Sequence, residues 1–384
     1  MMGLSVDFIA VAGRFLLVTL SILSLHSSAP AQNKIRAAYS SISGIFTPVW
    51  IATDERLYQK NQIDADLLYI GGSSVAVSAL IAGEIDFIYG GADPIVSGIL
   101  GGADLTLAGF ISNTTPISLY VVPGIARVED LKGKAVAVTR LASSTAYMAK
   151  VCFAQYNMEA VKDVPLIQSG GYPESVAAMQ AGRVQAAMLA PPATYRAEAL
   201  GFKRIWNGAG VEYPSFVLAT RRSFVRDSTD KAQRVFNSVA EGVHIFRADK
   251  ERALRIMAKY TKVSDRKILE NTYADNKEVH SPNMRPTASG VKTILDILAA
   301  SNPKAAAAKP EQFIDVTGLR GRFAYVQVAD PYHRLYESRS IGESFQILRP
   351  SSTRDSSRRV CSSILSHRDI LRASGTPGAS SAST

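Results

Sequence analysis

The chain has 384 residues, 47% of them hydrophobic, and a formal net charge of +10. This length accommodates two domains, and the hydrophobic content is that of a globular protein. The charge is concentrated at the end, because seven Arg and three acidic residues follow from Arg339 onward and about +6 remains for residues 32–338. In residues 32–338 basic and acidic residues alternate, and no basic helix with interleaved aromatic residues is found. We therefore expect no nucleic-acid partner.

Cysteine and histidine are too few and too scattered for a disulfide framework or a metal site. The chain contains only Cys152 and Cys361, and its five histidines lack metal-ligand spacing. Phosphate-binding loops, serine-nucleophile elbows and zinc-protease motifs are also absent from the sequence. We therefore assign no catalytic residue, no metal and no cofactor.

The N-terminal segment has the pattern of an export signal. Arg14 precedes an apolar run from Phe15 to Leu25, and Ala29-Pro30-Ala31 follows with the small residues of a cleavage site. This run is shorter than the roughly 20 residues that span a bilayer, which argues against a membrane anchor. Residues 1–31 are therefore predicted to be a signal peptide that is cleaved near Ala31, with a periplasmic mature chain.

From residue 34 onward strands and helices alternate. Strands are predicted at 34–39, 65–70, 85–89 and 105–110, and helices at 47–58, 74–82 and 94–99. Such alternation predicts an α/β fold with a parallel sheet, in which ligands bind beyond the carboxyl ends of the strands. The loops at 40–46, 71–74 and 90–93 all lie at that end.

The stretch from Asp66 to Asp93 contains two strands that each run into a glycine pair and then a helix start. Ser73 or Ser74 supplies an oxygen that can cap the first helix, and Gly83 suits its C-terminal end. Asp93 before a proline is a favourable start for the second helix. Helix N-termini carry unpaired N–H groups and partial positive charge, so they can bind an anionic or polar ligand.

This stretch has an internal repeat. Met179 to Pro192 matches Leu80 to Asp93 at an offset of 99 residues, with Gly182 in the position of Gly83. Matching strand-to-helix loops in two copies predict two similar α/β lobes that face each other. A ligand is then expected between them.

The lobes are predicted to be joined by two crossings. The apolar run 117–122 leaves the first lobe, and the run 216–220 returns to it. We expect lobe 1 to comprise 32–120 together with 217–320, and lobe 2 to comprise 121–216. The Arg- and Ser-rich segment 321–384 has few apolar residues and is predicted to be disordered.

Three segments together resemble the periplasmic solute-binding proteins of ABC importers. These are Ile35–Phe110, Val128–Thr145 with its Asp130-Leu-Lys-Gly-Lys134 sequence, and Tyr172–Ala190. The branch that they resemble most is the nitrate, sulfonate, taurine and thiamine-precursor group, and the resemblance covers about residues 33–320. It implies a two-lobed type II periplasmic binding protein fold, each lobe a mostly parallel sheet flanked by helices. It also implies a monomer that captures a small molecule and delivers it to a membrane permease.

The resemblance also implies where the ligand is bound. It places contacts after the first three strands of lobe 1 and at two helix starts of lobe 2, with two further candidates near the crossings. The residues are Ser41, Phe46, Gly72, Ser73, Ala92, Asp93, Ser143, Ser144, Thr145 and Ala190, with Ser112 and Tyr213 near the crossings.

Each of these residues also has a purely structural interpretation. Ser73, Ser144 and Asp93 could simply cap helices, and Arg140 could bind an anion or form a structural ion pair. Two other functions also stay open. The thiamine-precursor branch includes biosynthetic enzymes, although these carry a cysteine-rich motif that is absent here, and a ligand-sensing subunit of a membrane receptor would have the same sequence features.

Overall fold

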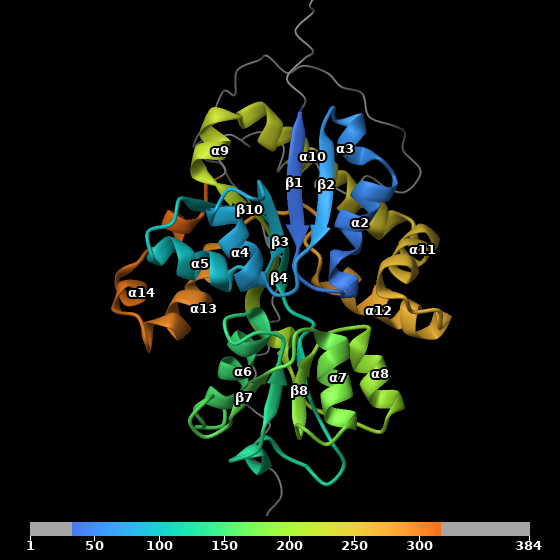
Figure 1. Cartoon of the computed structure of the whole chain (residues 1–384), viewed down its shortest axis with the longest axis vertical. Helices are drawn as coiled ribbons and strands as arrows, with labels where there is room; N and C mark the ends of the chain where they lie inside the picture. The colour runs from blue at the N-terminus through green and yellow to red at the C-terminus, as the bar shows by residue number, and fades with distance from the viewer. Residues whose placement is uncertain (1–32, 316–384) are drawn as a thin grey trace, which may run out of the picture. The chain divides into compact units, whose positions relative to one another are not determined.

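A computed structural model describes residues 33–315 of the chain. The predicted signal peptide, residues 1–31, and the segment 321–384 lie outside the described residues. The described residues belong to one compact unit and form two five-stranded sheets flanked by helices (Figure 1). Within 33–315, every helix is too short or too polar to cross a bilayer.

The first sheet, with the helices that pack on it, is called lobe 1. Its strand order is β2-β1-β3-β10-β4. β1, β2 and β3 are parallel, whereas β10 is antiparallel to both of its neighbours, so four of the five strands point the same way. The strand bounds are β1 (Lys34–Tyr39), β2 (Asp64–Tyr69), β3 (Phe87–Gly90), β4 (Leu105–Thr114) and β10 (Glu212–Arg221).

The second sheet, with its helices, is called lobe 2. Its strand order is β7-β6-β8-β5-β9, and β5 is the reversed strand. In each lobe the reversed strand is the one on which the chain arrives from the other lobe, so the two sheets have the same topology. The predicted two-lobed type II fold with mostly parallel sheets is thereby confirmed. The strand bounds are β5 (Ser118–Val121), β6 (Val136–Val138), β7 (Leu166–Gln168), β8 (Ala186–Leu189) and β9 (Lys203–Asn207).

The internal repeat of the sequence is a repeat of structure. α4 (Ser73–Ile81) and β3 are followed 99 residues later by α7 (Tyr172–Gln180) and β8, with identical lengths. Gly83 and Gly182 follow these two helices with φ of +76° and +70°. A residue with a side chain is disfavoured in this left-handed conformation, which explains the glycine in both copies.

In lobe 1 the remaining helices lie close to their predicted positions. The predicted helix 47–58 is two helices, because Arg56 takes the left-handed φ of +54° and interrupts it. The helix bounds are α2 (Thr47–Asp54), α3 (Leu57–Lys60) and α5 (Asp93–Leu100) in lobe 1, and α6 (Ser144–Ala154) and α8 (Ala193–Ala199) in lobe 2.

The chain after β10 is helical and packs on lobe 1 (Figure 1). α10 lies against α2, and their apolar side chains enclose a core with Trp50, Val239 and Phe246 fully buried. The helices are α9 (Arg222–Asp227), α10 (Thr229–Ala248), α11 (Lys250–Thr261), α12 (Arg266–Val279), α13 (Ala288–Ala299) and α14 (Pro303–Ala307), and the short 3-10 turns of the chain are η1 (Gly44–Phe46), η2 (Val128–Leu131), η3 (Gly208–Gly210) and η4 (Pro310–Phe313).

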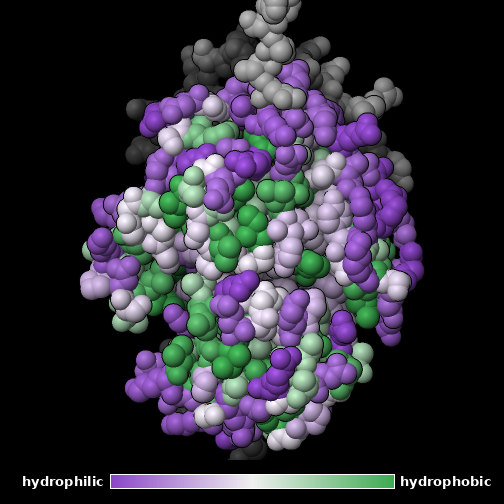
Figure 2. All heavy atoms as spheres, in the orientation of Figure 1, coloured by the Kyte–Doolittle hydropathy of each residue, from purple (hydrophilic) through white to green (hydrophobic). Residues whose placement is uncertain are grey.

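Large hydrophobic side chains reach the surface near the edge strands. In lobe 1, Leu68 on β2 and Val75 on α4 are 41% and 46% exposed, and in lobe 2 Leu141 and Ile167 are exposed as well. Figure 2 shows the hydrophobic surface gathered in patches among hydrophilic residues on this face. The buried apolar residues, by contrast, fill the space between each sheet and its helices.

Candidate functional site

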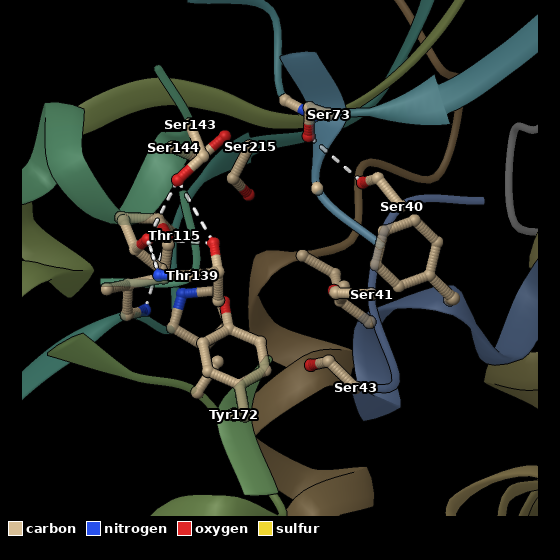
Figure 3. A pocket seen from close by; sticks show the side chains of 18 residues that line it. Ser40, Ser41, Ser43, Ser73, Thr115, Thr139, Ser143, Ser144, Tyr172 and Ser215 are labelled. Carbon is tan, nitrogen blue, oxygen red and sulfur yellow. Dashed lines mark hydrogen bonds between the residues drawn. The ribbon is translucent and has the colours of Figure 1, made fainter. Parts of the chain in front are cut away.

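A pocket lies between the two lobes, at the carboxyl ends of β1, β3, β6 and β8 (Figure 3). Its open volume is about 40 Å³. Eighteen residues from both lobes and from the first crossing line it: Ser40, Ser41, Ser43, Ile45, Phe46, Gly72, Ser73, Gly91, Thr115, Pro116, Ile117, Thr139, Ser143, Ser144, Thr145, Tyr172, Ala190 and Ser215.

The wall of this pocket combines hydroxyl groups with apolar surface and carries no formal charge. Ten of the eighteen residues are serine or threonine, and none of them carries a formal charge. α4 begins at Ser73 and α6 at Ser144, so two helix N-termini from different lobes reach the wall. The first N–H groups of a helix have no partner within it and carry partial positive charge. The pocket is therefore built to bind a small polar or anionic group without a charged side chain.

The serine side chains at the helix starts form hydrogen bonds with loop residues instead of capping their helices. Gly72 is the N-cap of α4, and no side chain caps this helix. The Ser73 hydroxyl lies 3.0 Å from that of Ser40, which follows β1. Ser143 is the N-cap of α6 but donates to the Arg140 carbonyl at 2.7 Å. Simple helix capping therefore does not explain these hydroxyls.

Three hydroxyls of lobe 2 form a closed cluster in the pocket wall. The oxygens of Thr139, Ser143 and Thr145 lie 2.9 to 3.0 Å from one another. The Thr139 N–H also donates to the Thr145 hydroxyl at 2.9 Å. All three side chains are buried, so this network holds the loop between β6 and α6 in one conformation.

Asp93 is a buried carboxylate that links the lobes. It is the first residue of α5, and its Oδ1 accepts hydrogen bonds from Ser144 of lobe 2, at 2.9 Å, and from Tyr213. Burial raises the pKa of Asp93 to about 6, and the bonds from Tyr213 and Ser144 oppose this rise. Asp93 thus does not line the pocket, but it lies directly behind one of the residues that do.

Hydrogen bonds to backbone carbonyl groups also join the two lobes. The Ser43 hydroxyl and the Gly44 N–H, from the loop after β1, both donate to the carbonyl of Pro191 in lobe 2, at 2.8 and 3.1 Å. The Tyr147 hydroxyl on α6 donates to the Thr293 carbonyl on α13 at 2.7 Å. These bonds describe an arrangement in which the lobes are closed on the pocket.

Two glycines allow this close approach. A Cβ on Gly91 would collide with the Ser144 hydroxyl and lie 2.8 Å from the Tyr213 hydroxyl. A Cβ on Gly72, which has a φ of +94°, would lie 2.5 Å from Cγ of Arg140 in lobe 2. The glycine pairs after β2 and β3 therefore make room for the opposite lobe.

Most of the residues that the sequence singles out come together at the pocket. Its wall includes Ser41, Phe46, Gly72, Ser73, Ser143, Ser144, Thr145 and Ala190. The other four lie outside the wall, because the chain turns into α5 after Gly91 and because β4 and β10 carry their side chains into the interior. These four are Ala92, Asp93, Ser112 and Tyr213, all of them buried.

Sequence reasoning also missed part of the wall. Ser215 lies next to a predicted strand and Thr115 lies in the crossing itself, and neither is among the expected site residues. Thr139 lies in the segment Val128–Thr145 that carries the resemblance, but it is not among them either. The repeat could have identified Thr139, because it follows β6 as Ser40 follows β1. Ser215 lies on β10 directly before the run 216–220, which the sequence predicts to return the chain to lobe 1.

A second, adjoining pocket has a different chemistry. It shares Ser40, Ser41, Thr139 and Tyr172 with the first, and about 80 Å³ of it is open to water-sized molecules. Its remaining wall carries a phenol and a carboxylate, from Tyr69 and Glu174. The second pocket therefore adds ionisable side chains beside a first pocket whose wall carries no formal charge.

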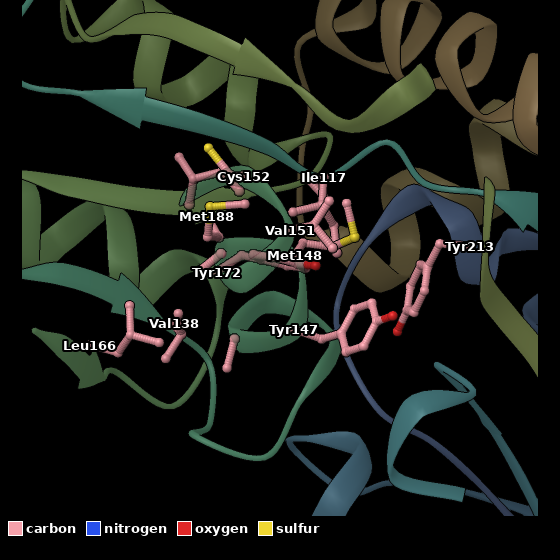
Figure 4. Close-up of a cluster of buried hydrophobic side chains, with 14 of the residues drawn as sticks. Ile117, Val138, Tyr147, Met148, Val151, Cys152, Leu166, Tyr172, Met188 and Tyr213 are labelled. Atoms are coloured by element: carbon pink, nitrogen blue, oxygen red, sulfur yellow. The ribbon is translucent and has the colours of Figure 1, made fainter. Parts of the chain in front are cut away.

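The interior behind lobe 2 is a packed core rather than a reactive site (Figure 4). Cys152 is buried there, and burial raises the pKa of its thiol to about 12. The Tyr147 ring stacks on that of Tyr213, with centroids 5.1 Å apart. Within residues 33–315 no cluster of three or more His, Cys, Asp or Glu side chains could hold a metal ion.

Comparisons with known proteins agree with this architecture. The model of the NMT1-like family matches residues 28–261, which is more than half of the chain. No curated protein matches the chain. Among solved structures, a protein of Bordetella bronchiseptica RB50 is similar with a TM-score of 0.69 and 21% identity, and the match covers 75% of this chain and 96% of that one.

Two further structures belong to proteins with named ligands. The alkanesulfonate-binding protein SsuA of Xanthomonas axonopodis pv. citri, bound to MOPS, has a TM-score of 0.62 and 19% identity over 72% of this chain and 95% of that one. The periplasmic nitrate-binding protein NrtA of Synechocystis PCC 6803 has a TM-score of 0.66 and 15% identity over 79% and 91%. The chain therefore belongs to the NMT1-like family and has the fold of the periplasmic solute-binding proteins.

Proposed function

We propose that this chain is the periplasmic substrate-binding component of an ABC importer. It captures a small molecule of the sulfonate, nitrate, taurine or thiamine-precursor type between its two lobes and presents it to a membrane permease. It acts as a monomer that is exported and cleaved near Ala31. The observation that carries this proposal is the uncharged, hydroxyl-rich pocket that both lobes line and that cross-lobe hydrogen bonds close.

Binding follows from the geometry of the pocket. The N–H groups at the starts of α4 and α6, together with the wall hydroxyls, replace the water around a polar or anionic group. Because these groups belong to different lobes, a bound ligand favours the closed arrangement. Closure then fixes the position of one lobe relative to the other. A permease that contacts both lobes can then distinguish the loaded protein from the empty one.

The wall chemistry supports binding rather than catalysis. Its hydroxyls hydrogen-bond to one another, to carbonyl groups and, in the case of Ser144, to the Asp93 carboxylate, and no histidine lines the pocket to act as a base for any of them. Cys152 is buried with a raised pKa, which disfavours the thiolate. We therefore propose a non-catalytic role.

A thermal-shift screen of the mature chain tests this function. The ligands are taurine, alkanesulfonates, nitrate, aromatic carboxylates and pyrimidine precursors. A ligand at 100 times its dissociation constant should stabilise the protein by about 2.7 kcal/mol. The double variant Ser144→Ala with Gly72→Val, which removes a wall hydroxyl and inserts a side chain against Arg140, should lose most of this stabilisation while still unfolding cooperatively.

The control is Gly210→Ala, because nothing lies within 4 Å of the added methyl group. This variant should respond to the ligand as the unmodified chain does. If no compound stabilises a folded chain, or if the double variant responds fully, the proposed binding site is wrong.

A further inference from the structure

Four hydroxyls of the pocket wall bond to a carboxylate or a carbonyl oxygen, and the direction of these bonds follows from the groups involved. An ionised carboxylate only accepts hydrogen bonds, so Ser144 and Tyr213 must both donate to Asp93. The single proton of the Ser144 hydroxyl is thereby used. Ser144 lines the pocket, and toward a ligand it can offer only the lone pairs of its oxygen.

Three other wall hydroxyls are committed in the same way. Each donates its proton to a backbone carbonyl, which can only accept: Ser43 to Pro191 at 2.8 Å, Ser143 to Arg140 at 2.7 Å and Ser215 to Thr114 at 2.5 Å. Toward the pocket these side chains are likewise acceptors. A wall made only for a bare oxyanion would present donors throughout, so this pattern predicts a ligand that also donates.

Donors are nonetheless present elsewhere in the same pocket. Thr115 accepts from the Ile117 N–H, which leaves the hydroxyl proton of Thr115 available. The first N–H groups of α4 at Ser73 lie in the wall as well. The pocket therefore has donors, among them the first N–H groups of α4 and α6, and also hydroxyl acceptors that include the side chain of Ser144.

Charge reinforces the acceptor group at Ser144. The Asp93 carboxylate lies one hydroxyl behind the wall, and its Oδ1 would be 3.0 Å from a Cβ on the wall residue Gly91. Lys150, on the exposed side of α6, is the weakest of the influences that favour the charged form of Asp93. The negative charge is thus buried next to the pocket and attracts a cationic group there.

We propose that Asp93, acting through Ser144, is a specificity determinant. It selects ligands that carry a hydrogen-bond donor, preferably an ammonium group, in addition to an anionic or acceptor group. This inference rests on the proposed binding function and narrows its ligand to a small zwitterionic or amine-bearing molecule. Asp93 is a positioning residue, because it touches the ligand only through Ser144.

Matched ligand pairs test the inference by calorimetric titration of the mature chain. Taurine and ethanesulfonate share a sulfonate and differ in the amine, and β-alanine and propionate differ in the same way with a carboxylate. We expect the amine-bearing member of at least one pair to bind at least tenfold more tightly. Equal affinity, or tighter binding of ethanesulfonate or propionate, overturns the inference while leaving the proposed binding function intact. If neither member of either pair binds, the inference is overturned, and the proposed binding function then depends on the other ligands of the thermal-shift screen.

Substitutions then assign the preference to Asp93. Asp93→Asn removes the charge and supplies an amide, so the preference for the amine-bearing ligand should fall to threefold or less. Asp230→Asn is the control, because Asp230 is exposed on α10 and should leave the preference unchanged. Ser144→Ala, which removes the acceptor while retaining the charge, provides a second readout and should also narrow the preference. A purely structural role of Asp93 would weaken both members of a pair equally, and that result contradicts the inference.

Discussion

Burial shifts the protonation of two residues near the site toward their neutral forms. It raises the pKa of Asp93 from 3.8 to about 6, and it lowers the pKa of His280 from 6.5 to about 4. His280 lies on the far side of the pocket loop, where its Nε2 bonds the carbonyl of the wall residue Ile45 at 2.8 Å. Both shifts link the stability of the chain to pH, and they do so with opposite signs.

The sign for each residue follows from which state binds the proton more tightly. Folded Asp93 takes up a proton at higher pH than the unfolded chain does, so its contribution to stability is fully present below pH 3.8 and is lost as the pH rises through 6. As the pH falls, His280 takes up a proton in the unfolded chain before it does so in the folded chain. Its contribution to stability is therefore present above pH 6.5 and is lost as the pH falls toward 4. Each amounts to roughly 3 kcal/mol, and the two largely cancel.

Removing one residue should therefore expose the pH dependence of the other. We predict that Asp93→Asn loses stability more steeply than the unmodified chain between pH 6.5 and pH 4, and that His280→Gln loses it less steeply. Urea unfolding at a series of pH values measures both free energies. Parallel pH profiles for the three proteins would show that neither side chain titrates as burial implies.

At the scale of elements, the contact between α10 and α2 depends on a single glycine. A Cβ on Gly242 would collide with the Pro48 carbonyl at the start of α2, the helix that follows the pocket loop. Gly242→Ala should therefore separate the two helices and destabilise the chain by about 1–3 kcal/mol, as overpacking does. Urea unfolding measures the change, with His244→Ala on the exposed side of α10 as the control. A Gly242→Ala variant that is as stable as the control would contradict this packing.

The sequence predicts the parallel part of each sheet well, because these elements carry their own signals. Gly83 and Gly182 end helices, apolar runs form the buried strands, and the repeat relates α4 to α7. The segments that follow these strands contain ten of the twelve expected site residues, and eight of the ten line the pocket. Local periodicity and turn chemistry are sufficient there, since one edge of a parallel sheet collects every such loop.

What the sequence does not encode locally is contact between distant segments. The bond from Ser144 to Asp93 joins residues 51 positions apart, and the bond from Tyr213 to Asp93 spans 120 positions. Asp93 therefore accepts hydrogen bonds behind the wall instead of lining it, and Tyr213 is buried against Tyr147. Such partners follow from the return of β10 between β3 and β4, which is a property of the topology.

At the scale of the whole molecule, binding is a matter of how the lobes close. The cross-lobe bonds from Ser43 to Pro191 and from Ser144 to Asp93 exist only when the lobes approach, and a ligand that touches both lobes favours that state. Gly91 is the position at which the approach is closest, because an added Cβ would meet the Ser144 hydroxyl. We therefore propose that closure of the two lobes, rather than the pocket wall alone, captures the ligand.

The most direct test is the distance between spin labels on the two lobes, measured with and without a ligand from the thermal-shift screen. Glu84→Cys and Arg183→Cys place the labels at exposed, equivalent turns after α4 and α7, with Cys361 replaced by serine. We predict that ligand changes the distance in the otherwise unmodified chain and in a Gly210→Ala control, but not in Gly91→Ala, whose affinity should fall at least tenfold. A ligand that binds tightly while the distance stays the same, or that still changes it in Gly91→Ala, would contradict capture by closure.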